Sequence, residues 1–148
     1  MANPPAEANP PAEAVDVARR VLEHEADGSG PADRAQAVQT VFVRLGDHMR
    51  DLLGSRGALT LIGRALNLAR RQHRGLAGVT LSTELPATFT GLAEALAKET
   101  PENATEAGTA ILAHFLHLLI ILLGYELAMH PVRKLWPHAM SSVTESDE

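Results

Sequence analysis

The sequence predicts an all-α fold, a single-domain bundle of about five helices around a central apolar helix at about residues 105–130. Aromatic residues make up only 3% of the chain, and alanine and leucine carry most of its apolar content, which favours helices over strands. Several segments repeat apolar residues at helical spacing. A length of 148 residues suits one hydrophobic core.

We expect the helical domain to cover residues 12–138, between two disordered tails. The first tail, residues 1–11, contains most of a tandem NPPAEA repeat, and such proline-rich sequence has no apolar face to bury. The second tail, residues 139–148, is polar and acidic. A short charged helix is expected to open the domain at about Ala12.

Two strong helices are predicted in the middle of the chain. Asp33 and Gln36 resemble a capping box at the start of the first helix, and Gly54 ends it. The second helix follows at once and is closed by Gly75. So short a connection must turn the two helices back on each other as an antiparallel hairpin.

The segment that follows this hairpin is predicted to hold one more amphipathic helix. The stretch VTLST at 79–83 is extended by propensity and predicts a single short strand or a loop, with no second strand to pair with it. Pro86 is suited to the first position of the next helix, whose inward face would include Phe89.

The stretch AILAHFLHLLIILLGYELAMH, residues 110–130, forms most of the predicted central helix. Asn103 is expected to cap this helix, and Pro131 to kink or stop it. Its longest apolar run is interrupted by His117 and is shorter than the roughly 20 residues that a membrane span needs. Because the other helices need a partner for their apolar stripes, we predict a core helix and no constitutive span. Insertion of residues 110–130 into a membrane on a trigger is a third functional hypothesis.

Charge is distributed unevenly along the chain. The net charge is −5, yet residues 31–75 hold eight arginines against three acids. An acidic chain with one arginine-rich segment is a poor general nucleic-acid binder, so no nucleic-acid partner is expected. The N-terminus has neither the basic nor the apolar region of a secretory signal, and we therefore expect a cytoplasmic location.

The leading functional hypothesis is a non-enzymatic regulatory or scaffolding module that acts through protein–protein interaction. The sequence contains none of the common nucleophile, phosphate-loop or zinc-protease motifs, which argues against an enzyme. Arg64, Arg71 and Arg74 would form the polar side of the interaction surface, with Leu135 and Trp136 as its apolar anchor. The partner would be another protein or a second copy of the chain.

The alternative hypothesis is a sensor that binds its ligand beside histidines of the bundle core. His114 and His117 lie three residues apart, so they occupy neighbouring positions on one helix face, and His73 falls on the apolar seam of its own helix. Imidazole nitrogens bind divalent metals and haem iron, and bundles hold apolar ligands between helices. No cofactor is predicted under the leading hypothesis, in which these histidines only pack in the core.

The phrases GALTLIGRALNLARRQH and LAHFLHLLIILLGYELAMHPVRKLWP, in that order, resemble an uncharacterised family of small bacterial all-helical domains that end in a Trp-Pro motif. The resemblance covers about residues 38–137. It implies a bacterial helical module and no particular activity. The family pattern has adjacent Gly and Glu late in the apolar helix, whereas here Tyr125 separates Gly124 from Glu126. The resemblance therefore implies no role for Glu126.

Overall fold

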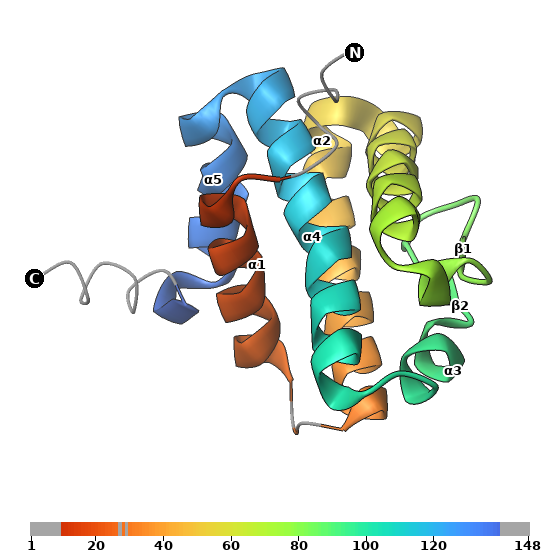
Figure 1. The fold of residues 1–148 in the computed structure, drawn as a ribbon. Helices are drawn as coiled ribbons and strands as arrows, with labels where there is room; N and C mark the ends of the chain where they lie inside the picture. The colour runs from red at the N-terminus through yellow and green to blue at the C-terminus, as the bar shows by residue number, and fades with distance from the viewer. Residues whose placement is uncertain (1–9, 27, 29, 140–148) are drawn as a thin grey trace, which may run out of the picture.

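Helices make up most of the chain, as Figure 1 shows. The computed structural model describes residues 10–26, 28 and 30–139, so most of both predicted tails lies outside the described residues. The predicted all-α bundle is confirmed. Its elements are α1 (Ala12–Glu25), α2 (Pro31–Gln72), η2 (Arg74–Leu76), β1 (Thr80–Leu81), β2 (Phe89–Thr90), α3 (Leu92–Ala97), α4 (Pro101–Leu123) and α5 (Tyr125–Leu135).

α2 consists of two helices joined at one glycine. Gly54 has φ 78° and ψ 163°, a backbone conformation that is essentially restricted to glycine. The first half of α2, residues 31–53, and the second half, residues 55–72, fold back on each other there, as predicted (Figure 1). The start of α2 differs from the prediction. Gly30 is the N-cap, and the Asp33 carboxylate accepts a hydrogen bond from its N–H over 3.3 Å.

α4 is the central buried helix. It starts at Pro101, where the Thr100 hydroxyl accepts a hydrogen bond from the Asn103 N–H over 3.2 Å. The prediction that Asn103 itself caps this helix was wrong, because the hydroxyl three residues earlier satisfies its N–H. α1, α2, α3 and α5 all pack against α4, so each can bury an apolar stripe on it.

The predicted C-terminal boundary of the apolar helix was also wrong. α4 stops at Leu123, because Gly124 takes up φ 86° and ψ 161°, which a helix does not tolerate. The chain then reverses into α5, and Pro131, expected to kink or stop the apolar helix, lies inside α5 and is buried there. The region predicted as one helix over about 105–130 is therefore two helices with a sharp turn between them.

A small antiparallel sheet takes the place of the predicted single strand or loop. In it, Thr80 lies opposite Thr90 and Leu81 opposite Phe89. The helix predicted to start at Pro86 was wrong, since α3 starts only at Leu92. Strands of two residues carry too little alternation to be read from a sequence.

Phe89 connects this sheet to the core. Its backbone is held by the Gln39 side chain, whose Nε2 donates to the Phe89 carbonyl over 2.7 Å and whose Oε1 accepts from the Phe89 N–H over 2.8 Å. Its ring meets the edge of Phe42 at a centroid distance of 5.1 Å, and Phe42 meets Phe115 of α4 at 5.4 Å. Such edge-to-face contacts join the sheet, α2 and α4 into one core.

α4 also has the length and composition of a membrane span. It is the one helix of the described residues that meets both criteria, and 67% of its most apolar window is buried within the bundle. The central helix of a soluble bundle meets the same criteria.

Candidate functional site

Two helix-to-helix turns in this bundle have the same construction. Gly54 joins the two halves of α2, and Gly124 joins α4 to α5, with φ/ψ values of 78°/163° and 86°/161°. A Leu-Leu pair precedes each glycine, Leu52 and Leu53 in one case and Leu122 and Leu123 in the other. We call these two turns the elbows.

Both elbows lie at the same end of the bundle (Figure 1). The first half of α2 and α4 touch where Gly108 meets Val38, since a Cβ on Gly108 would lie 3.3 Å from Val38 Cγ2. Val38 lies 16 residues before Gly54, and Gly108 lies 16 residues before Gly124. The two helices run in the same direction, so each rises about 24 Å from this contact to its elbow. The two turns therefore end at the same level.

The elbows expose apolar side chains at equivalent positions. Leu53 and Leu123 pack partly against the core, whereas Leu52 and Leu122, one residue earlier, are 61% and 56% exposed. Ile121 (53%) and Leu127 (60%) flank the second elbow. The large hydrophobic side chains exposed among the described residues are these four. We call Leu52, Ile121, Leu122 and Leu127 the elbow surface.

α5 brings the two elbows together. It runs antiparallel to the first half of α2, because Arg44 lies over Trp136 while His48, further along α2, lies beside His130, earlier in α5. The rings of His48 and His130 are 6.5 Å apart. Leu52 lies one helical turn after His48 in α2, and Leu127 lies about one turn before His130 in α5. Both leucines are therefore closer to the elbows than the two histidines. Leu52 and Leu127 therefore lie on neighbouring helices at the same height.

Charged groups of both signs surround the elbow surface. On α2, Arg50 pairs with Asp47 over 3.7 Å, and on α5, Arg133 pairs with Glu126 over 3.1 Å. All four side chains are 44–82% exposed to solvent, so each pair is worth less than about 1 kcal/mol to the fold. The charged side chains that border the elbow surface therefore create no strong net electrostatic field there.

The predicted interaction surface is only partly assembled. Arg64 and Arg71 lie on the second half of α2, seven residues apart and hence on one face, and both are exposed. Arg74 is exposed too, but it lies in η2, because α2 ends at Gln72. Leu135 is half-buried at the end of α5, which lies on the opposite side of α4 in Figure 1. The arginines and Leu135 therefore do not form one surface.

Trp136 was expected to be an exposed apolar anchor, and its burial contradicts that expectation. It is 1% exposed, and its indole Nε1 donates to Glu25 Oε2 over 2.6 Å. The Arg44 guanidinium lies over the ring, 5.6 Å from its centroid. An aromatic side chain covered in this way closes the end of the bundle and offers no surface to a partner.

The three predicted ligand histidines lie close enough to influence one another. His114 is fully buried, and its Nε2 lies 2.9 Å from Gln72 Oε1. Because an amide oxygen only accepts, Nε2 carries the proton in this pair. Burial lowers the pKa of His114 to about 4, and repulsion of the charged form by His117 and His73 contributes to this lowering. Burial also lowers the pKa of His117.

These histidines do not complete a metal site in this geometry. Within residues 10–26, 28 and 30–139, no group of three or more His, Asp or Glu side chains is placed to hold a metal ion. Nδ1 of His114 and Nδ1 of His117 are buried without a hydrogen-bond partner among those residues. The structure therefore places His114 in the core and leaves His117 half-buried beside it, and the haem and metal hypotheses stay predictions.

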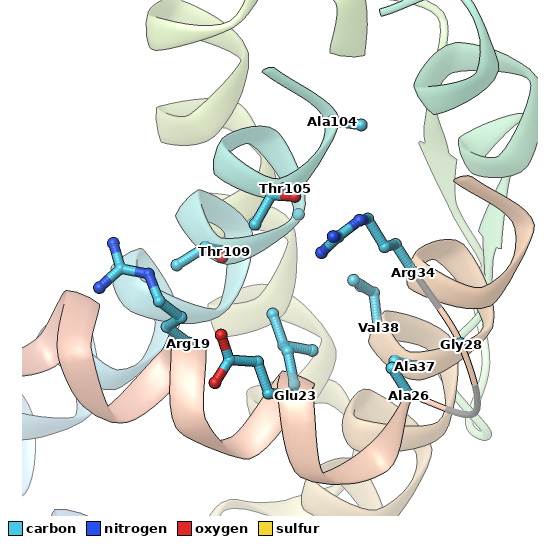
Figure 2. A pocket seen from close by; sticks show the side chains of 12 residues that line it. Arg19, Glu23, Ala26, Gly28, Arg34, Ala37, Val38, Ala104, Thr105 and Thr109 are labelled. Atoms are coloured by element: carbon cyan, nitrogen blue, oxygen red, sulfur yellow. The ribbon is translucent and has the colours of Figure 1, made fainter. Parts of the chain in front are cut away.

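A separate pocket of about 410 Å³ opens between α1, α2 and α4. Figure 2 shows Arg34 reaching from α2 towards Thr105 of α4, with Glu23 rising from α1 below them. Val38 and the small residues of α4 contribute apolar walls. The pocket is not lined by His73, His114 or His117, so a ligand bound here would not use the predicted histidines.

Comparisons of the chain with family models, curated proteins and solved structures find no match. The resemblance to a bacterial helical family therefore stays a prediction, and function has to be inferred from the residues themselves.

The elbow surface was not among the predicted sites. A signal for it exists in the sequence, since the triplet Leu-Leu-Gly occurs at 52–54 and again at 122–124. The first glycine was predicted to end a helix, whereas the second lies within continuous apolar sequence that masks the turn.

Proposed function

We propose that this chain is a non-enzymatic interaction module that binds a protein partner, either another protein or a second copy of the chain, through the elbow surface. One observation carries the proposal. The four large apolar side chains that the described residues expose all lie at two equivalent turns at one end of the bundle. Apolar groups gathered in this way mark interaction sites, because removing apolar surface from water is favourable by about 25 cal/mol per Å², before the cost of association is subtracted.

The chemistry of the elbow surface supports binding. Its centre is aliphatic, and the charged groups beside it, Arg50 with Asp47 and Arg133 with Glu126, are already paired within the chain. An apolar centre with a polar rim is the usual anatomy of a protein interface. The exposed leucines contribute little to the fold, since more than half of each remains in water.

Co-purification from the native cell tests the proposal. The full chain carrying Leu52→Glu and Leu122→Glu should lose the proteins that the wild type retains, while its melting temperature stays within a few degrees, because both positions are exposed. Ala93→Glu with Ala97→Glu on α3 is the matched control, since both alanines are exposed and the added charge is the same. Equal retention by the wild type and both variants would refute the proposal.

A second candidate function is the binding of a small amphiphilic anion in the pocket of Figure 2. The favouring observation is the combination of apolar walls with two arginines, Arg19 and Arg34, against one acid, Glu23, in the lining of a pocket whose volume is within the range of ligand sites. Titration of the full chain with octanoate, followed by amide NMR, should shift Val38 and Thr109, and Thr105→Leu should block the shift. Unchanged spectra at millimolar octanoate would reject this candidate.

A further inference from the structure

We propose that the partner on the elbow surface is a second copy of this chain, bound about a twofold axis. This inference rests on the proposed function and names the partner. In a twofold contact the same patch is used by both copies, so the patch has to be complementary to itself. The aliphatic centre meets this condition, because leucine packs against leucine.

The charges around the elbow surface are nearly balanced, which a contact between identical surfaces also requires. The acids are Asp47, Asp51, Glu126 and also Glu13, whose side chain bonds to Tyr125 beside the second elbow, and the arginines are Arg50, Arg56 and Arg133. All seven are exposed, and their charges sum to only −1, whereas the whole chain carries −5. Since Arg50 with Asp47 and Arg133 with Glu126 are already balanced within each copy, a twofold axis can bring two such surfaces together without opposing a strong charge of one sign.

The small net charge around the elbow surface also favours a second copy over other partners that could bind an exposed apolar surface. An anionic bilayer attracts segments with an excess of lysine and arginine, at about 1 kcal/mol for each basic residue near the surface. The charged residues around the elbow surface include no excess of lysine and arginine over acids. A strongly acidic or basic protein would likewise find no complementary field.

The size of the patch sets the strength expected of the dimer. Four aliphatic side chains, each little more than half exposed, offer a few hundred Å² per copy, against about 800 Å² in a stable interface. The dimer should therefore be reversible, with a dissociation constant on the order of tens of micromolar.

Sedimentation velocity of the purified full chain tests the inference. Between about 1 and 500 µM, the mass should rise from 15.8 kDa towards twice that value. Leu52→Glu with Leu122→Glu should remain monomeric throughout, and Ala93→Glu with Ala97→Glu should dimerise as the wild type does. Circular dichroism establishes that each variant is folded.

A wild type that stays monomeric at 500 µM would overturn the inference, and so would a Leu52→Glu, Leu122→Glu chain that dimerises normally. Flotation of the wild type with vesicles of phosphatidylcholine and phosphatidylglycerol, lost in the same double variant, would assign the surface to lipid and also overturn it. A monomeric wild type would leave the co-purification test of the proposed function intact, so the two failures can be told apart.

Discussion

Trp136 and Glu25 join the two ends of the helical domain. The indole Nε1 donates to Glu25 Oε2 over 2.6 Å, across 111 positions of sequence. The same oxygen accepts from Arg44 Nη1 over 2.7 Å, and the Arg44 guanidinium covers the indole. α1, α2 and the chain after α5 are therefore held at one carboxylate. This contact stands at the C-terminal end of α5, whereas the elbow surface stands at its N-terminal end.

Replacing Trp136 by Phe should reveal the contribution of this hydrogen bond. The substitution keeps an aromatic ring but removes the N–H, so we expect a loss of about 1–3 kcal/mol in the free energy of unfolding. Trp136→Ala should cost about 3–5 kcal/mol, because it also empties a buried volume. Urea unfolding measures both, and equal stability of the wild type and the Phe variant would contradict the assignment.

The Gln39 side chain should be required for docking of the small sheet. Gln39→Ala removes both partners of the Phe89 backbone, and we expect a loss of about 1–3 kcal/mol. Gln39→Glu keeps the acceptor for the Phe89 N–H, but it replaces the donor to the Phe89 carbonyl with a carboxylate oxygen that repels this carbonyl. Urea unfolding should therefore show a loss for both variants, with faster hydrogen exchange at Phe89. Wild-type exchange in the alanine variant would argue against this role.

The elbow glycines should be sensitive to any side chain. Apart from the neighbouring residues in the chain and the adjoining helix backbone, no described atom lies within 4 Å of a Cβ built on Gly54 or Gly124, so the cost of Gly→Ala there comes from the positive φ. We expect a loss of about 1–3 kcal/mol at each position. Gly78→Ala is the control, since the space around it is also open and its φ is not in the positive region. Thermal melts that rank all three variants alike would be inconsistent with this account of the elbows.

His114 should make the fold sensitive to acid. Its pKa is about 4 in the folded chain, against 6.5 for a histidine in water, so between these values the unfolded chain binds a proton that the folded chain does not. The contribution of His114 to stability is therefore complete above pH 6.5 and is lost as the pH falls to 4, by up to about 3 kcal/mol. His114→Gln should flatten the slope of unfolding free energy against pH in this window. An unchanged slope in that variant would show that other groups cause the sensitivity.

The sequence predicts the helical elements better than the turns between them. Gly54 is recognisable because it separates two amphipathic patterns, and the hairpin follows from the short connection. Gly124 is hidden because apolar residues continue on both sides of it, so periodicity carries the predicted helix through to Pro131. The backbone conformation of Gly124 depends on how α4 and α5 pack, and the local sequence pattern does not carry that information.

Long-range contacts explain the remaining differences at the candidate sites. Nothing near Trp136 in the sequence indicates that Glu25 and Arg44 will cover it. His73 lies close to His114 because the second half of α2 folds back along the bundle. The predicted hairpin included this reversal but did not indicate which residues it brings together. Leu52 and Leu122 are exposed because a helix ends directly after each of them. The sequence predicts the end at Gly54 but not the end at Gly124.

Site-specific photo-crosslinking in the native cell tests the role of the elbow surface most directly. A benzophenone amino acid in place of Leu122 of the full chain should give a covalent adduct with a second copy or another protein. The same group in place of the exposed Ala97 on α3 should give none. Absence of any protein adduct from positions 52, 122 and 127 would contradict the proposal that this chain acts by docking through its elbows.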